Sequence, residues 1–365
     1  MKKITDITLI GSGIIGLLTA KALIETGLSV SIIEKNQQSL ESSWAGGGIL
    51  LPLYPWQQKS AISDLVKQSL SLYPLLSQQL IQATQIDPEW NDCGLLISKN
   101  DDINKATEWC QHYKIDYQLA NEALFKSFNT TPFNPLWLPT IAQARNPRLL
   151  KSLKQFLVQH PNVQFIENCT LTDFSFKNNR ISQIKTSKGN FSINHLLLAT
   201  GAWTGKLSQK LLPSNNPINI NPVKGQMLLF DANVNDLNTM ILDGSHYLIP
   251  RRDGKILAGS TVENTDFNKS TTAEAKESLK KFAVTLMPTL KNKAIIHHWA
   301  GLRPGTKYGV PYIDNHPEIE NLSINAGHFR NGLVMAPASA QLMTDLILKR
   351  EPCLNPEPYQ LTRLD

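Results

Sequence analysis

The first 34 residues constrain the fold more than any other part of the chain. Residues 6–10 read "DITLI", an apolar run typical of a short buried strand, and "GSGIIG" follows directly. Next, "IIGLLTAKALIETG" places apolar residues at helical spacing and ends at Gly27, and "LSVSIIE" is a second strand pattern that ends at Glu34. This order of strand, glycines, helix and strand predicts a βαβ unit that binds a dinucleotide.

Each glycine of this unit has a physical task. Gly11 allows a sharp turn, Gly13 lets the backbone approach a pyrophosphate, and Gly16 lets the helix lie close to the sheet. The helix N-terminus would direct its N–H groups and the positive end of its dipole at the phosphates. Glu34 lies about twenty residues beyond the central glycine, where an acid accepts hydrogen bonds from ribose hydroxyls. An acid at this position disfavours NADP and leaves FAD and NAD.

The next segment favours FAD over NAD. A nicotinamide enzyme usually continues with regular strand and helix units, whereas this chain continues with "LESSWAGGGILLPLYPW". Its three consecutive glycines permit close approach of the backbone to a flat ligand, and the apolar residues on both sides argue against a freely solvated loop. Further along, "NHLLLATGAW" is an apolar strand that ends in Ala-Thr-Gly, a frequent second contact in FAD-binding folds.

Length and pattern predict two domains, because 365 residues are too many for one simple core. The middle of the chain has strand patterns, and the two stretches 163–174 and 180–189 predict a small antiparallel sheet. We expect an α/β (α+β) fold with a discontinuous, Rossmann-like FAD-binding domain and a β-sheet-rich substrate domain. The first would comprise residues 1–84, 142–218 and 312–365, and the second residues 85–141 and 219–311.

Composition bears on partners and location. The 36 Lys and Arg against 30 Asp and Glu give a net charge of +6, but no basic stripe is longer than a pair such as Arg251 and Arg252. This favours small anionic ligands over nucleic acid. The four cysteines form no C-x-x-C pair and have no histidine at metal spacing, so we expect no metal site and a reducing cytoplasm. Asp6 and Lys21 bound the first apolar run, which predicts neither a signal peptide nor a membrane span.

The stretch "WAGLRPGT", residues 299–306, places Arg303 in a tight and largely apolar setting. Pro304 and Gly305 follow and predict a rigid turn. A guanidinium held in this way is either part of a structural ion pair or a fork for a carboxylate or phosphate ligand.

Seven short motifs in a fixed order cover nearly the whole chain. They are "GSGIIG", "ATGAW", "VKGQ", "YLIPRRDG", "AGSTVE", "WAGLRPGT" and "GHFRNG", the last followed by "APA". With these motifs the sequence resembles the D-amino acid oxidase superfamily, and within it the bacterial glycine oxidases associated with thiazole (thiamine) biosynthesis. The resemblance places the family's substrate-binding tyrosine at Tyr247, its carboxylate-binding arginine at Arg303 and its second active-site arginine at Arg330.

The resemblance implies a reaction and a cofactor. The reaction is oxidative deamination of glycine and small amines or D-amino acids to the imine or 2-oxo acid. A hydride passes to flavin N5 and O2 is reduced to H2O2, which would supply the glycine imine for thiamine synthesis. No cysteine lies near residues 325–335, so the FAD would be non-covalent. The residues expected around it are Gly11, Gly13, Ile14, Ile15, Gly16, Glu34, Lys35, Ser42, Ser43, Ala45, Gly46, Gly47, Gly48, Leu171, Ala199, Thr200, Gly201, Trp203, His328, Phe329, Arg330, Asn331, Gly332 and Leu333.

One departure and several alternatives accompany this resemblance. Family members commonly have Ala-Ala-Gly-Met where this chain has Gly46, Gly47, Gly48 and Ile49, so we expect a different pocket shape beside the flavin. A quinone-linked D-amino acid dehydrogenase would use the same fold. A flavin domain acting on modified tRNA is disfavoured by the lack of a basic stripe and of a methyltransferase domain. The resemblance also implies a homo-oligomer.

Overall fold

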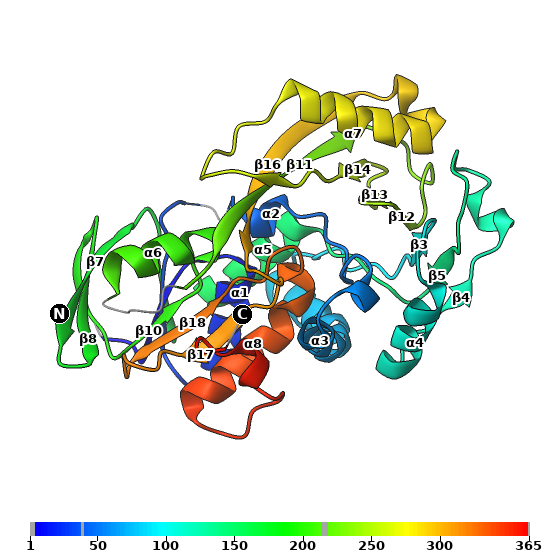
Figure 1. Ribbon diagram of the computed structural model, residues 1–365. Helices are drawn as coiled ribbons and strands as arrows, with labels where there is room; N and C mark the ends of the chain where they lie inside the picture. Colours follow the sequence, from blue (N-terminus) through cyan, green and yellow to red (C-terminus); the bar gives the residue numbers. More distant parts are fainter. Residues whose placement is uncertain (1–3, 38–39, 213–217, 364–365) are drawn as a thin grey trace.

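The computed structural model describes residues 4–37, 40–212 and 218–363. It contains a mostly parallel sheet that is packed with helices, and a larger, mostly antiparallel sheet (Figure 1). The parallel sheet has the strand order β17-β18-β10-β1-β2-β6, with β17 antiparallel to β18. Its strands are β1 (Ile7–Ile10), β2 (Val30–Ile33), β6 (Val163–Ile166), β10 (His195–Leu198), β17 (Tyr312–Asn315) and β18 (Leu322–Ala326).

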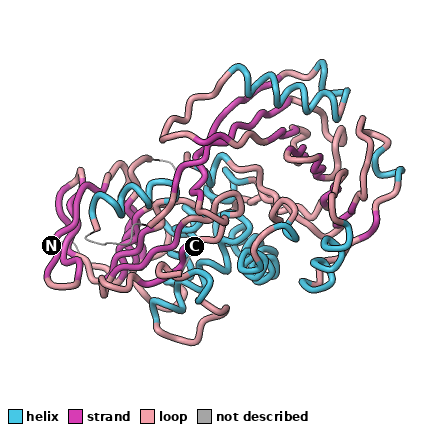
Figure 2. The backbone as a smooth tube through the Cα atoms, in the orientation of Figure 1, coloured by secondary structure: helices cyan, strands magenta, loops and turns pink. Residues whose placement is uncertain are grey.

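The central parallel strands are mostly apolar, and successive side chains point to opposite faces, so that both faces of the sheet are covered. On β10, Leu197 joins the core beneath the helices, whereas Leu196 and Leu198 join the core beneath a three-stranded antiparallel sheet. Figure 2 shows the helices gathered beside the parallel sheet. The helices of this region are α1 (Ile14–Ile24), α2 (Ser42–Ala45), α3 (Ser60–Thr84), α5 (Asn146–Val158), α6 (Thr204–Leu211) and α8 (Gly332–Leu348).

The three-stranded sheet corrects one expectation. The stretch 163–174 divides: β6 pairs in parallel with β2, and only the following strand joins the antiparallel sheet. The reason is that β6 forms the half-buried edge of the parallel sheet, a long-range pairing that its own residues do not encode. The small sheet consists of β7 (Leu171–Lys177), β8 (Arg180–Thr186) and β9 (Gly189–Ser192).

The larger sheet has the order β15-β11-β14-β13-β12-β3-β5-β4, and β16 also pairs with β11. Helix α7 (Ala273–Leu286) packs against it through Leu279, Ala283 and Leu286. In Figure 1 the long strands β11 and β16 run from this sheet towards the parallel one. Its strands are β3 (Leu95–Ile97), β4 (Gln118–Leu119), β5 (Leu136–Leu138), β11 (Asn221–Phe230), β12 (Met240–Asp243), β13 (His246–Pro250), β14 (Ile256–Gly259), β15 (Glu263–Asn264) and β16 (Ile295–Gly305).

The remaining helix α4 (Ile103–Tyr113) lies beside β3 to β5, and five short 3-10 helices connect other elements of the described chain. They are η1 (Pro55–Gln57), η2 (Glu122–Phe125), η3 (Gly201–Trp203), η4 (Pro288–Asn292) and η5 (Glu357–Tyr359).

The expected turn at Pro304 and Gly305 is wrong, because these are the last two residues of the strand β16. Pro304 is opposite Pro222 of β11 in the register, so two residues without N–H groups face each other, and Gly305 still pairs with Asn221. The strands of each sheet fall within the residue ranges expected for one of the two domains; the domain division itself stays a prediction. Among the described residues, no helix combines the length and apolar character that crossing a bilayer requires.

Candidate active site

A cavity of about 280 Å³ is lined by residues of both sheets. From the parallel sheet come the ends of β1, β2 and β10 and the segment before α8; from the other come residues of β11, β13 and β16. The carboxyl ends of parallel strands are the usual ligand-binding edge of such a sheet. The cavity therefore connects the glycine turn after β1 with Tyr247 and Arg303.

The glycine turn leaves no room for side chains. Gly11 has φ +103°, and a Cβ there would lie 2.6 Å from the carbonyl oxygen of Ala199 at the end of β10. A Cβ on Gly16 would lie 2.1 Å from the carbonyl oxygen of Gly11, so the first turn of α1 packs directly on this turn. Gly16 does not line the cavity, which agrees with a packing role. The N-terminus of α1 is thereby held at the cavity wall.

Glu34 is buried at the end of β2 and is already bonded to the protein. Its Oε2 accepts hydrogen bonds from the N–H and hydroxyl of Ser12, at 2.9 and 2.8 Å, and its Oε1 accepts one from the N–H of Asn36 at 3.1 Å. A carboxylate has about four lone-pair sites, so acceptor capacity remains. The ribose contact stays a prediction. Beside it, the Lys35 ammonium lies 3.4 Å from the centre of the Trp203 ring.

The glycines at 46, 47 and 48, here called the glycine triplet, are each confined by protein atoms. A Cβ on Gly48, whose φ is +91°, would lie 2.0 Å from the carbonyl oxygen of Ala144. A Cβ on Gly47 would lie 2.9 Å from the Ile249 side chain and 3.1 Å from the Tyr247 ring. The triplet therefore allows a close approach to the strand that carries Tyr247, in addition to any approach to a ligand.

Asn146, the first residue of α5, is a cavity residue that sequence reasoning missed. Its Nδ2 donates a hydrogen bond of 2.6 Å to the carbonyl oxygen of Ser43, while its buried Oδ1 has no hydrogen-bond partner in the part of the chain that the structure describes. A buried polar atom without a partner is rare in a folded protein and marks a place where a ligand atom can bind. Its only sequence signal is an Asn-Pro pair that starts a helix.

Arg303 lies on β16, and its guanidinium covers Gly225 on the neighbouring strand β11. A Cβ on Gly225 would lie 2.1 Å from Nη2 of Arg303. Nη1 donates to the carbonyl oxygens of Lys224 and Thr261, at 3.3 and 3.1 Å, and Nη2 donates to the Ser260 hydroxyl at 2.9 Å. No carboxylate of the described residues forms an ion pair with it. The side chain is positioned by neutral oxygens, which leaves its charge for a ligand.

A second guanidinium lines the same cavity. Nη2 of Arg330 is buried and lacks a hydrogen-bond partner. Burial, with a smaller contribution from Arg330, lowers the pKa of Arg303 to about 10, although Tyr247 and Glu263 oppose the shift. Arg303 therefore remains charged at neutral pH. Two cations that share a cavity without acid partners define an anion-binding site.

The segment before α8 forms the other wall. His328 is buried, its Nε2 is 3.0 Å from the Ser339 hydroxyl, and burial lowers its pKa to about 3, so the ring is neutral. Asn331, Gly332 and Leu333 line the cavity where α8 begins. The N-terminus of this helix favours negative charge in the cavity.

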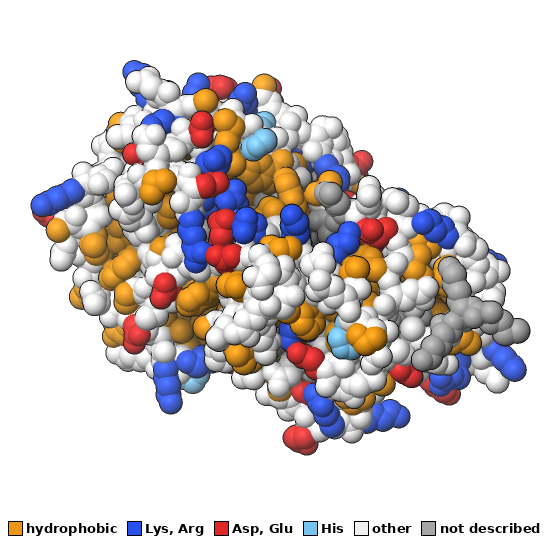
Figure 3. Space-filling view, turned by 180° about the vertical axis from the view of Figure 1, so that it is seen from behind, with side chains coloured by type: hydrophobic (Ala, Val, Ile, Leu, Met, Phe, Trp, Pro, Cys, Tyr) orange, Lys and Arg blue, Asp and Glu red, His pale blue; other side chains and the backbone are white. Residues whose placement is uncertain are grey.

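The structure brings the predicted site residues together. All of those expected around the cofactor, except Gly16, line the cavity, as do Tyr247 and Arg303. Their individual contacts with FAD stay predictions. The described residues contain no group of three or more His, Cys, Asp or Glu side chains arranged to hold a metal ion. On the face shown in Figure 3, acidic and basic side chains are interspersed without a continuous basic stripe.

These features fit a flavin dinucleotide. One end of the cavity has the glycine turn, a helix N-terminus and Glu34 at the end of β2. The other end has an aromatic residue and two guanidinium groups that form no ion pair with the described residues. The fold and the site define the class of two-sheet, FAD-dependent oxidoreductases. The model of the DAO family, FAD dependent oxidoreductase, matches residues 6–346, and the chain belongs to this family.

Individual relatives agree with this assignment. Glycine oxidase of Pseudomonas putida is 41% identical over 362 residues, covering 97% of each chain. The bifunctional protein ThiO/ThiG of Synechocystis is 29% identical and matches 96% of this chain, which spans 53% of that protein. The crystal structure of glycine oxidase from Geobacillus kaustophilus has a TM-score of 0.91 at 25% identity and covers 99% of both chains.

Proposed function

We propose that this enzyme is a glycine oxidase. It converts glycine, small amines or D-amino acids to the imine or 2-oxo acid with FAD and reduces O2 to H2O2. The similarity to the Pseudomonas putida glycine oxidase supports the substrate class. The similarity to the Synechocystis ThiO/ThiG protein supports a place in thiamine synthesis, with the glycine imine as the product consumed.

One observation carries the substrate assignment: the guanidinium of Arg303 lines the cavity, bonded only to neutral oxygens of the described residues. A planar guanidinium binds a carboxylate through two parallel hydrogen bonds, which fixes two atoms of the substrate and so orients its Cα–H. Tyr247 would donate its phenolic hydrogen to the same carboxylate. Arg330 adds positive charge that attracts the substrate.

The cofactor and the chain divide the chemistry between them. Bound FAD supplies the acceptor for the two electrons and the hydrogen that leave the substrate Cα. Residues of the glycine turn and Glu34 would hold its dinucleotide part, and the segment from His328 to Leu333 would lie along its ring. The amine reacts in its neutral form, so the chain needs to orient the substrate but not to supply a general base. The N-terminus of α8 stabilises negative charge in this part of the cavity.

The test is an anaerobic screen of the purified holoenzyme for loss of visible flavin absorbance. Glycine, sarcosine and both enantiomers of alanine and proline are the candidate substrates. We expect glycine to bleach the flavin, and H2O2 to form in a 1:1 ratio with the amine consumed when air is admitted. Reduction of quinone analogues with negligible O2 uptake would reassign the protein as a dehydrogenase. No bleaching by any of these amines would overturn the proposal.

Two further parts of the proposal concern the setting of the enzyme. All four cysteines, Cys93, Cys110, Cys169 and Cys353, are free thiols in the structure, which is compatible with the proposed reducing cytoplasm. We also propose a homo-oligomer with non-covalent FAD. Light scattering would give the mass of the assembly, and release of flavin on denaturation would test the non-covalent link.

A further inference from the structure

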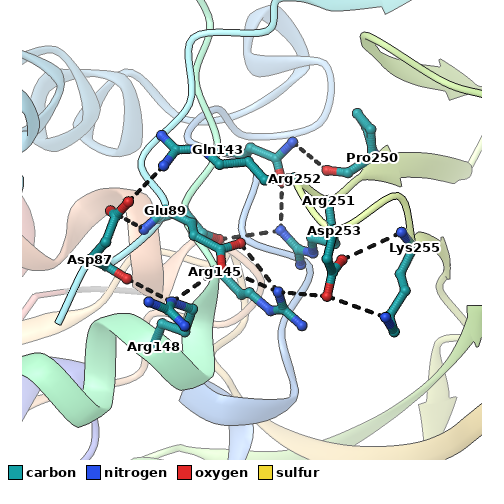
Figure 4. Close-up of polar contacts among 11 residues, drawn as sticks. Asp87, Glu89, Gln143, Arg145, Arg148, Pro250, Arg251, Arg252, Asp253 and Lys255 are labelled. Carbon is teal, nitrogen blue, oxygen red and sulfur yellow. Dashed lines mark hydrogen bonds and ion pairs between the residues drawn. The ribbon is translucent and has the colours of Figure 1, made fainter. Parts of the chain in front are cut away.

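Arg251 is a buried cation directly behind the glycine triplet, and the function proposed above does not use it. It follows the last residue of β13, and only 8% of it is exposed. Its Nη2 donates a hydrogen bond of 2.7 Å to the carbonyl oxygen of Gly47, and its Nη1 donates one of 2.5 Å to Oε1 of Gln143. Figure 4 shows this guanidinium pointing at Gln143.

Acidic residues surround Arg251, but each is paired with another cation. We call these acids and their partners the arginine network; its members are drawn in Figure 4. Arg251 takes part in none of its ion pairs. They join Asp87 to Arg252, Glu89 to Arg145 and Arg148, and Asp253 to Arg145 and Lys255.

Arg251 has no ion-pair partner among the described residues, and an unpaired charge is costly to bury. Burial lowers the pKa of Arg251 to about 10, and the group is still charged at neutral pH. A buried cation without an acid must be stabilised by its hydrogen bonds, and bonds from a charged donor are the strong ones. Its strongest acceptors belong to Gly47 and Gln143, which are far from it in sequence. The charge therefore holds three chain segments together.

These three segments meet at the end of β13, the strand that carries Tyr247. Gln143 also donates a 2.7 Å hydrogen bond from Nε2 to the carbonyl oxygen of Pro250, the last residue of β13. The bonds of Arg251 and Gln143 thus tie the glycine triplet to the end of the strand that carries Tyr247. The gap is already narrow, because a Cβ on Gly47 would lie 3.1 Å from the Tyr247 ring. Movement of the triplet would change both the wall of the cavity that faces the cofactor and the width of this gap.

We propose that Arg251 is a positioning residue that holds the Gly47 carbonyl and so fixes the glycine triplet against Tyr247. It thereby sets the position of the flavin ring and the width of the gap between Gly47 and the Tyr247 ring, where the substrate would bind. The cofactor part of this inference depends on the family alone, and the substrate part rests on the proposed function.

The test compares Arg251→Met with Arg252→Met in the purified holoenzyme. Met keeps much of the apolar stem and removes the fork. Arg252 is the adjacent control, because it is exposed and its ion pair with Asp87 involves neither Gly47 nor Gln143. For Arg251→Met we expect FAD release, followed by free-flavin fluorescence, to be about tenfold faster and KM for glycine to rise about tenfold, with kcat changed less than about threefold. Arg252→Met should stay within about twofold of the unaltered enzyme in every measurement.

The remaining outcomes decide the inference. Lower thermal stability of Arg251→Met with unaltered FAD release and KM would leave Arg251 only a structural role and overturn the proposal. A change in FAD release alone, or in KM alone, would overturn it as well. If Arg251→Met does not fold, Arg251→Lys decides. Lysine keeps the charge but loses the fork, so intermediate values support the proposal and values equal to the unaltered enzyme overturn it. If the unaltered enzyme oxidises no amine, the proposed function fails and FAD release alone decides the role of Arg251.

Discussion

Two groups of arginines in this protein differ in how their charges are balanced. In the arginine network, Arg145, Arg148 and Arg252 pair with carboxylates. In the cavity, Arg303 and Arg330 have no ion-pair partner among the described residues, and one nitrogen of Arg330 has no hydrogen-bond partner. Paired charges serve the fold. Unpaired cations in a cavity destabilise the free protein, which is the expected arrangement when an anionic ligand supplies the missing charge.

Replacing Arg303 with leucine should have the largest effect on activity, because this arginine has no ion-pair partner among the described residues. The change removes a charge-assisted contact worth about 2–5 kcal/mol, so kcat/KM for glycine should fall roughly thirtyfold to several thousandfold while FAD stays bound. Steady-state kinetics and the flavin spectrum measure the two effects. The matched variant Arg145→Leu cuts paired charges instead. It should lower the free energy of unfolding by roughly 1–3 kcal/mol and leave kcat/KM nearly unaltered.

Kinetics of Arg303→Leu equal to those of the unaltered enzyme would remove this residue from substrate binding. If kcat/KM falls as much for Arg145→Leu as for Arg303→Leu, then arginines paired with carboxylates and arginines in the cavity do not differ in function.

A smaller effect is expected when Arg303 is displaced but kept. In Gly225→Ala the new Cβ would lie 2.1 Å from Nη2 of Arg303, and a side-chain end can move whereas a backbone cannot. The fold should therefore survive, but kcat/KM should fall about 10- to 100-fold, mainly through KM. Ser260→Ala removes one hydrogen bond and leaves the guanidinium in place, so its loss should be about tenfold or less. If Gly225→Ala keeps the KM of the unaltered enzyme, the observed position of Arg303 is not the one that binds substrate.

The cofactor side was predictable because its signals are local. Gly11, Gly16 and Glu34 follow one another within a single βαβ unit, and the turn, helix and strand there depend on neighbours in sequence. The fold class and the protein family were predictable from the same unit and from the order of the motifs. The expected turn at Pro304 failed because pairing with β11, a long-range contact, overrides a local turn preference.

The arginine side was predictable only through family resemblance. No spacing in the sequence tells that Arg303 bonds Thr261 and Ser260 while Arg251 bonds Gly47. Each arginine is identified by partners that the fold brings from distant segments. Arg251 and Arg252 are adjacent and alike in sequence, yet one is buried and the other exposed. Sequence reasoning noted them only as a basic pair.

The half-buried histidine His195 sharpens the comparison, because it loses its charge where arginine keeps it. Burial lowers the pKa of His195 to about 4, and its Nε2 bonds the Ser323 hydroxyl. The folded pKa lies below the unfolded value of about 6.5, so the unfolded state binds more protons as pH falls. Stability should therefore be complete above about pH 7 and decline towards pH 5, by on the order of 1–2 kcal/mol from His195. Denaturant unfolding at both pH values should show a smaller decline for His195→Gln; an equal decline would assign the pH dependence to other groups.

The smallest effect is expected for a balanced arginine on the surface. Arg180 pairs with Glu320 at 3.0 Å, and 52% and 62% of their side chains are exposed. Water and salt screen such a pair, so Arg180→Ala should change the free energy of unfolding by at most about 1 kcal/mol, and less at high salt. Arg145, with 25% of its side chain exposed and two acid partners, should exceed it clearly in the same unfolding experiment. Equal losses for the two variants would mean that pairing alone, without burial, determines what an arginine contributes to this fold.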